Sequence, residues 1–126
     1  MTVEPDAAGS SLFERAGGFA SVSRIVMSFY DRVLDSELLA PWFETTDMRT
    51  LIDHQTKFVA SLMGGPAAYS DEALRRVHAR LAITRAAFDE MKRLLGEALE
   101  EHGIDADDVA RTLARIERCA PAIVSA

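Results

Sequence analysis

The chain has 126 residues, 48% of them hydrophobic and 27% charged, which is the composition of a globular domain rather than of a disordered or membrane protein. The net charge of −6 argues against nucleic acid as the main partner, because phosphate binding needs a clustered positive field. No apolar run has the length of a membrane span. We expect residues 1–10 to be a disordered tail and 11–126 to be a single domain. One cysteine, Cys119, fits a reducing compartment and therefore a cytoplasmic protein.

The first half of the chain predicts three helices. A short helix begins near Ser10 or Ser11, which can cap it, and stops at Gly17-Gly18. A second helix covers 19–34, and a connection made irregular by Pro41 leads to a third, which Asp47 can cap and which Gly64-Gly65 ends. The second and third helices each carry an apolar stripe with helical spacing. The stripe of the second helix is Val22, Ile25, Val26, Phe29 and Val33, and that of the third is Met48, Leu51, Ile52, Gln55, Phe58, Val59 and Leu62.

Helical spacing continues through the second half. In "LRRVHARL" we expect Leu74, Val77, His78 and Leu81 to share one helix face, since they lie at i, i+3, i+4 and i+7. The next helix carries Phe88, Met91, Leu95 and Leu99 and stops at Gly103. The last one can be capped by Asp105 and carries Val109, Leu113, Ile116, Ala120 and Ile123. No segment alternates with period two for long, so the chain is predicted to be all-α, with about five or six helices.

Two of these stripes carry a polar residue where an aliphatic one is expected. Gln55 lies near the centre of the third helix's stripe, and His78 lies in the fourth. Tyr30 flanks the stripe of the second helix, so its hydroxyl can also be buried. Each residue taken alone is explained by an ordinary core or edge position, because a buried polar group needs only a hydrogen-bond partner. On three separate helices that can face one core, they together indicate a shared pocket.

A lone histidine among aliphatic residues suits an iron held in an organic ring better than a bare metal ion. A structural zinc site normally needs four protein ligands, and Cys119, His54 and His102 show no matching spacing. A haem needs one proximal histidine, an apolar slot and a distal pocket with hydrogen-bond donors. The slot could be formed by residues that an ordinary core would also use, namely Phe29, Phe43, Phe58, Phe88, Met48 and Met91.

Five short segments between Leu12 and Ile104 match a known family in their order and spacing. They read "LFERAGG", "SFYDRVL", "HQTKFV", "GGPAAY" and "VHARLAI". With these segments the chain resembles the truncated haemoglobins, and within them group I. Groups II and III carry a tryptophan where this chain has Met91, which supports group I. The resemblance implies a truncated globin fold, two helices packed over two around haem b (iron protoporphyrin IX).

The resemblance also implies roles for individual residues. His78 matches the axial ligand of haem iron, Tyr30 the distal tyrosine that donates a hydrogen bond to the bound gas, and Gln55 the glutamine that completes that network. Leu51 matches the distal position where many larger globins place a histidine. No residue is assigned as catalytic. The residues implied to contact haem, besides His78, are Phe43, Met48, Leu51, Phe58, Leu74, Ile83, Phe88 and Met91.

His54 has two interpretations. It precedes Gln55 and lies roughly 100° away around the helix, on the flank of the stripe. This spacing favours a position in solvent or at the haem edge. In some cyanobacterial relatives the matching histidine binds the iron directly, so His54 as a second axial ligand is the alternative.

For function, the resemblance implies binding of O₂, NO and CO at haem iron. NO dioxygenation or a peroxidase-like reaction would need an external electron donor or reductase. Two alternatives remain open. One is a bis-histidine haem protein for redox chemistry or gas sensing, with His54 and His78 as ligands. The other is a helical interaction module without cofactor, in which His78 and Gln55 find partners inside a dry core.

Overall fold

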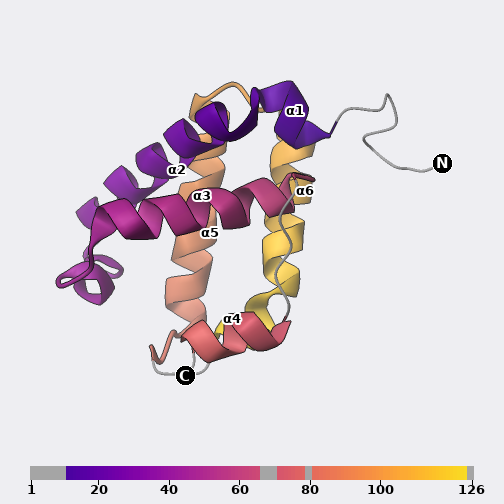
Figure 1. Ribbon diagram of the computed structural model, residues 1–126. Helices are drawn as coiled ribbons and strands as arrows, with labels where there is room; N and C mark the ends of the chain where they lie inside the picture. Colours follow the sequence, from indigo (N-terminus) through magenta and orange to yellow (C-terminus); the bar gives the residue numbers. More distant parts are fainter. Residues whose placement is uncertain (1–10, 66–70, 79–80, 125–126) are drawn as a thin grey trace.

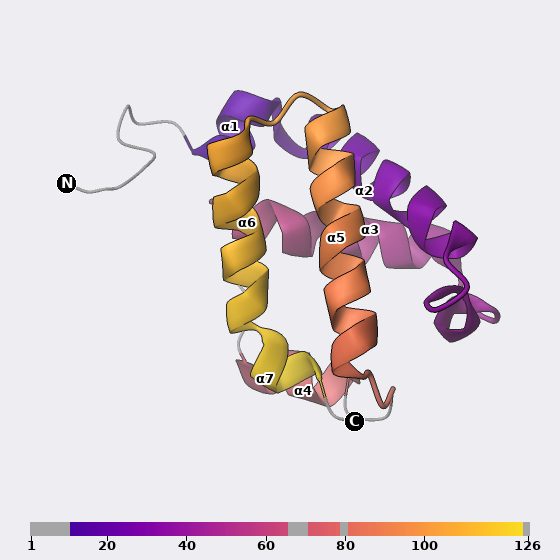
Figure 2. The same ribbon diagram turned by 180° about the vertical axis from the view of Figure 1, so that it is seen from behind.

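The computed structural model describes residues 11–65, 71–78 and 81–124, and in these residues it contains helices and no strand (Figures 1 and 2). The predicted tail, 1–10, lies outside the described residues. The prediction of an all-α fold is confirmed. The elements are α1 (Leu12–Ala16), α2 (Gly18–Asp35), the 3₁₀ turn η1 (Ala40–Phe43), α3 (Met48–Leu62), α4 (Asp71–His78), α5 (Arg85–Glu101), α6 (Ala106–Arg118) and α7 (Ala120–Ile123).

Side chains cap the first turns of four helices. At α1, the Ser11 hydroxyl accepts from the Glu14 amide while the Glu14 carboxylate accepts from the Ser11 amide, which is a capping box. Asp47 and Asp105 cap α3 and α6, as predicted. Thr84 caps α5 and was not predicted. The starts of these helices therefore follow from the local sequence.

The main helices form two pairs, α2 with α3 and α5 with α6, and the two pairs cross each other. α2 packs against α3 and α5, α5 packs against α6, and α3 contacts α6. Figure 2 shows α5 and α6 running side by side with α3 crossing behind them, and Figure 1 shows the same crossing from the other side. α4 packs against α7 at the end of the molecule away from α1. This two-over-two arrangement is the predicted truncated globin fold.

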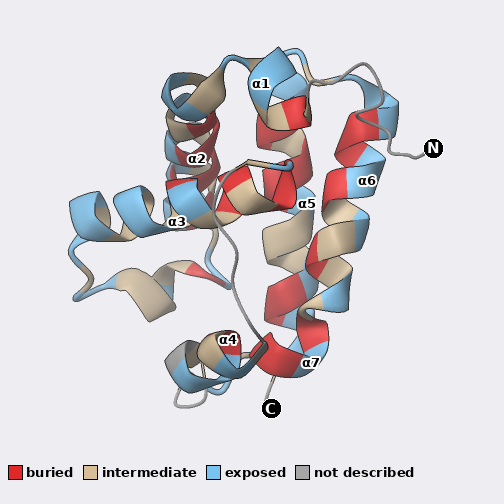
Figure 3. Ribbon diagram, turned by 45° about the vertical axis from the view of Figure 1, so that its right-hand side comes forward, coloured by how far each residue is buried: buried red, intermediate tan, exposed pale blue. Residues whose placement is uncertain are grey.

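The predicted apolar stripes of α2 and α5 form the centre of the core. Val22, Val26 and Leu99 are fully shielded from solvent. Figure 3 shows buried residues along the inner sides of α2, α5 and α6. The core is continuous from α1 to α7 because all these stripes meet in one cluster. In the described part of the chain, no helix is long and apolar enough to cross a membrane.

The glycine pair at the end of α3 makes a tight stop. The Gly64 amide donates to Ser61 O (3.2 Å) and the Gly65 amide to Ala60 O (2.8 Å), the two hydrogen bonds of a Schellman motif. Gly64 has φ +86°, which glycine adopts without strain. A Cβ on Gly65 would lie 2.8 Å from Ala60 O and 3.1 Å from the Phe13 ring. Both glycines are therefore needed for α3 to end against α1.

The structure corrects the prediction for the segment from Leu74 to Leu81. Leu81 lies in a turn and not in a helix, and its amide donates to His78 O (3.0 Å). Ala82 then has φ +52°, in the left-handed region, so the chain changes direction. Leu81 is 41% exposed, and the prediction that it shares the buried face with Leu74 is wrong.

The predicted last helix is two helices. α6 ends at Arg118 and α7 begins at Ala120, with Cys119 between them. Pro121 explains the break, because proline has no amide hydrogen to donate to the carbonyl four residues earlier, that of Glu117. Ile123 is nevertheless buried as predicted, so the apolar stripe continues across the break.

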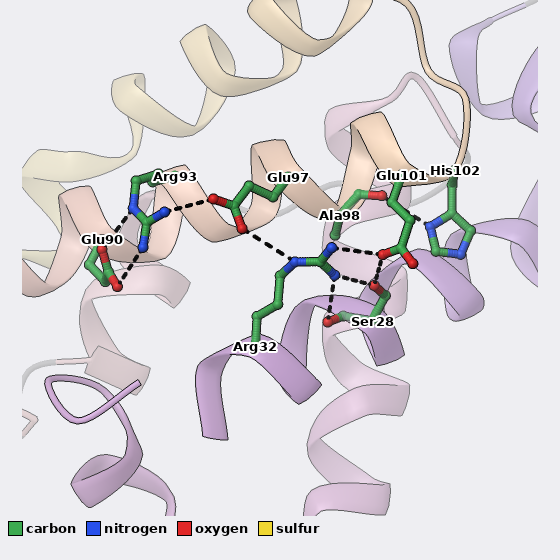
Figure 4. Close-up of polar contacts among 8 residues, drawn as sticks. All are labelled: Ser28, Arg32, Glu90, Arg93, Glu97, Ala98, Glu101 and His102. Carbon is green, nitrogen blue, oxygen red and sulfur yellow. Dashed lines mark hydrogen bonds and ion pairs between the residues drawn. The ribbon is translucent and has the colours of Figure 1, made fainter. Parts of the chain in front are cut away.

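Charged side chains connect α2 to α5 (Figure 4). Arg32 contacts Glu97 (3.4 Å) and Glu101 (2.8 Å). The Ser28 hydroxyl donates to Glu101 (2.7 Å), and Arg93 also contacts Glu97 (2.6 Å). Hydrogen bonds from Ser28 and Arg32 hold the pKa of the Glu101 carboxyl below its ordinary value. The network is partly exposed to solvent, so its contribution to overall stability is small.

Candidate functional site

His78 is held in one orientation and one tautomer. It ends α4 and is half-buried, and its Nδ1 lies 2.7 Å from Leu74 O. Because a carbonyl oxygen can only accept, Nδ1 carries the proton and donates it. Nε2 then has a free electron pair, which is how a histidine that binds a metal is commonly arranged. In its neutral form, His78 could therefore bind a metal through Nε2.

Tyr30 brings a buried hydroxyl to the inner side of α2. It is 6% exposed, and its ring packs against Phe29 and Phe43, with centroids 4.7 Å and 5.7 Å away. Burial raises the pKa of Tyr30 above its ordinary value of 10.0, so the hydroxyl keeps its proton in neutral solution and can donate it. No residue in the described ranges partners this hydroxyl. A buried hydroxyl without a protein partner is left to be satisfied by a small molecule, either water or a bound ligand.

Gln55 and His54 are neighbours on α3 with different surroundings. Gln55 is half-buried, and its side-chain amide has no partner among the residues described. His54 is exposed, which agrees with the position that the helical spacing favoured. Leu51 is half-buried one turn before Gln55. Because α2 and α3 pack together, Tyr30 and Gln55 bring two unpartnered donors to adjacent helices.

The apolar residues expected to contact haem divide into two groups. Leu74 and Phe88 are buried, with 7% and 1% exposed. The others keep part of their surface open while packing against the core, and they come from η1, α3, α5 and the segment before α5. Large apolar side chains left half-exposed on several elements favour a further apolar group beside them. These half-buried residues are Phe43, Met48, Leu51, Phe58, Ile83 and Met91.

Trp42 has a contact that was not predicted. It lies on η1, next to Phe43, and its indole Nε1 donates to Leu81 O (2.7 Å). The contact joins residues 39 positions apart. In the sequence, Trp42 was notable only as the single tryptophan, next to Phe43, which was expected to contact haem. That position did not indicate which residue Trp42 would bond.

The residues present fit a haem. His78 offers one nitrogen with a free electron pair, while the Tyr30 hydroxyl and the Gln55 amide are donors for which the described residues provide no partner. A flat, largely apolar ring would cover the half-buried apolar side chains. The Tyr30 hydroxyl and the Gln55 amide would then donate hydrogen bonds to a polar ligand of the iron instead of to protein groups.

Comparison with known proteins agrees with this chemistry. The family profile described as bacterial-like globin matches residues 11–125. Group 1 truncated hemoglobin GlbN of Mycolicibacterium paratuberculosis is 33% identical over 116 residues, which cover 92% of this chain and 85% of that protein. GlbN of Nostoc sp. (strain MUN 8820) is 30% identical over 116 residues, which cover 92% of this chain and 98% of that protein.

Solved structures have the same fold. The truncated hemoglobin from Tetrahymena pyriformis in its Fe(III) form superimposes with a TM-score of 0.84 at 26% identity, covering 93% of this chain and 100% of that one. The 2/2 hemoglobin from Synechococcus sp. PCC 7002, in the cyanomet state with covalently attached heme, gives 0.82 at 26% identity, covering 91% and 98%. The chain therefore belongs to the bacterial-like globin family and, within it, to the group 1 truncated haemoglobins, which bind haem and, through it, diatomic gases such as O₂.

Proposed function

We propose that this protein holds haem b through His78 and binds O₂, NO or CO beside Tyr30 and Gln55. When bound, haem would supply an iron that can take up a diatomic gas. The observation that carries the proposal is the state of His78, whose Nδ1 is committed to Leu74 O and whose Nε2 is free. The unpartnered hydroxyl of Tyr30 supports it independently.

The distal donors would discriminate between gases. The Tyr30 hydroxyl is protonated at neutral pH because burial raises its pKa, and the Gln55 amide is a donor at any pH. A ligand that gains negative charge on binding, such as O₂, is stabilised by these donors. CO gains little charge, so the same hydrogen bonds stabilise it less.

The first prediction concerns His78. His78→Ala should abolish the absorption bands of histidine-ligated ferrous haem. The reason is that α4 has no second histidine whose Nδ1 bonds a carbonyl and leaves Nε2 for iron. The measurement is the spectrum of purified protein after haem addition, ferric, ferrous and with CO. His102→Ala is the matched control, since His102 Nδ1 also contacts a carbonyl four residues earlier (Ala98 O, 3.0 Å) but lies exposed at the end of α5. An unchanged spectrum in His78→Ala would remove the basis of the proposal.

The same spectra decide the alternative in which His54 is a second axial ligand. That arrangement predicts a low-spin ferric haem at rest, whereas a free distal side predicts a water-bound or mixed-spin one. The exposed position of His54 supports the free distal side. A low-spin spectrum lost in His54→Ala would instead support the bis-histidine redox or sensing protein.

We further propose oxidation of NO to nitrate as the reaction of the haem-loaded protein. One O₂, one NO and one electron make one nitrate ion, so an external electron donor or reductase must supply the electron. The distal donors support this reaction because they hold O₂ long enough for NO to arrive.

The test of this reaction is the amount of nitrate formed per NO consumed, with a chemical reductant present. We expect one nitrate per NO, and a lower rate in Tyr30→Phe. Consumption of NO without nitrate would contradict it. The cytoplasmic location also stays a prediction, which fractionation of cells that produce the protein would test.

A further inference from the structure

Trp42 connects the two sides of the proposed haem site. Its indole N–H, which can only donate, bonds Leu81 O at 2.7 Å. Within the described ranges, this is the only hydrogen bond between η1 and the segment 81–84. In Figure 3, the turn that carries η1 lies between α3 and α4. The hydrogen bond therefore joins η1, which precedes α3, to the segment 81–84, which follows α4.

Each partner in this hydrogen bond is one step from a residue of the proposed site. On one side, Trp42 is followed by Phe43, whose ring packs edge-on against the Tyr30 ring (5.7 Å, 73°). On the other side, the Leu81 amide donates to His78 O at 3.0 Å. A continuous chain of contacts therefore runs from Tyr30 through Phe43 and Trp42 to Leu81 and His78.

Among the described residues, 81–83 have few other contacts with the rest of the protein. Leu81 and Ala82 are exposed, and only Ile83 packs partly against the core. Ala82 is the one non-glycine residue with positive φ in the described residues (+52°). A strained backbone persists only where its surroundings hold it, and a segment with few buried contacts opens easily. The hydrogen bond from Trp42 is the contact that can hold this segment.

We infer that Trp42 and Leu81 form a clasp that closes one edge of the haem site and slows the loss of haem. The inference rests on the proposed haem binding at His78. With the clasp closed, the segment 81–84 would hold His78 in the position in which it binds haem. With the clasp open, this edge would be free to move and water could reach His78.

The test is the rate at which the protein releases haem to an excess of apomyoglobin, followed by absorbance. Trp42→Phe keeps an aromatic ring and removes the indole N–H together with the five-membered part of the indole ring. We expect release roughly two- to tenfold faster, the range that the net loss of one hydrogen bond gives. Thr112→Val is the matched control, since it also removes one side-chain hydrogen bond to a backbone carbonyl (Asp108 O, 2.9 Å), on α6 and outside the clasp. The control should release haem at the rate of the unaltered protein.

A second measurement uses the unaltered protein. Because the chain has one tryptophan, its indole N–H gives a single NMR signal. In the clasp, this hydrogen should exchange with solvent much more slowly than in free tryptophan, and more slowly with haem than without. This measurement decides the question even if Trp42→Phe does not fold.

Several results would overturn the inference. Release at the unaltered rate in Trp42→Phe, or equal acceleration in Thr112→Val, would show that the bond does not retain haem. Exchange as fast as in free tryptophan would show that the clasp is open in solution. Any of these results would reject the clasp alone. The proposed function would still be supported if the unaltered protein binds haem. A protein that takes up no haem would contradict the proposed function and the clasp together.

Discussion

Tyr30 is buried with no partner for its hydroxyl among the described residues, which is unfavourable in a protein without a ligand. A phenylalanine would pack equally well between Phe29 and Phe43, so packing alone does not explain the hydroxyl. The hydroxyl is explained if it acts on a bound gas. The same reasoning applies to the side-chain amide of Gln55, which is half-buried and unpartnered within the described part.

This gives a prediction at the scale of one residue. In the haem-loaded protein, Tyr30→Phe should raise the O₂ dissociation rate by roughly 10- to 150-fold, because a hydrogen bond to a charged group contributes about 1.5–3 kcal/mol. The measurement is stopped-flow displacement of O₂ by CO. Dissociation of CO from the same variant is the internal control and should change little. Equal changes for both gases would mean that Tyr30 acts by packing and not by donating a hydrogen bond.

At the scale of elements, a buried carboxylate fastens α1 to α6. The Asp108 side chain is only 6% exposed and accepts from Arg15 of α1 (3.2 Å) and from Arg111 of α6 (2.8 Å). Hydrogen bonding from Arg111, and then from Arg15, holds the pKa of Asp108 below its ordinary value of 3.8. The charged form is therefore the one that stabilises the fold.

Asp108→Asn should lower the free energy of unfolding at pH 7 by about 1–3 kcal/mol, because two charged hydrogen bonds to a buried group are weakened. Since the folded-state pKa is lowered, the contribution of Asp108 is present above its unfolded pKa and is lost as pH falls through the folded one. The unfolding curves of variant and unaltered protein should thus converge in strong acid. Urea titrations at several pH values measure this. Asp107→Asn, an exposed neighbour, is the control and should have little effect.

Helix ends show how far local sequence predicts an element. Ser11, Asp47 and Asp105 were predicted as caps and act as caps, because a cap bonds the amide of a residue two or three positions later. The position of Leu81 on the buried helix face was predicted wrongly. Leu81 continues the helical spacing, but its carbonyl accepts from Trp42, which is distant in sequence. Spacing cannot indicate such a partner.

At the scale of the whole molecule, the core has an apolar margin of half-buried side chains. They pack against the buried cluster and still expose part of their surface to solvent. A haem placed against them would remove that surface from water, which favours binding by the hydrophobic effect. Haem would then be a structural part of the core as well as the site of gas binding.

The sequence by itself determined the all-α class, the caps and apolar stripes of the main helices, and the family through short segments around Tyr30, Gln55 and His78. These features depend on residues close together in the chain, so periodicity and matching segments were sufficient to find them. Only the tertiary structure decided that Leu81 leaves the buried face and that Trp42 reaches its carbonyl. Those features depend on contacts between segments that are distant in sequence, and the packing of the helices sets them.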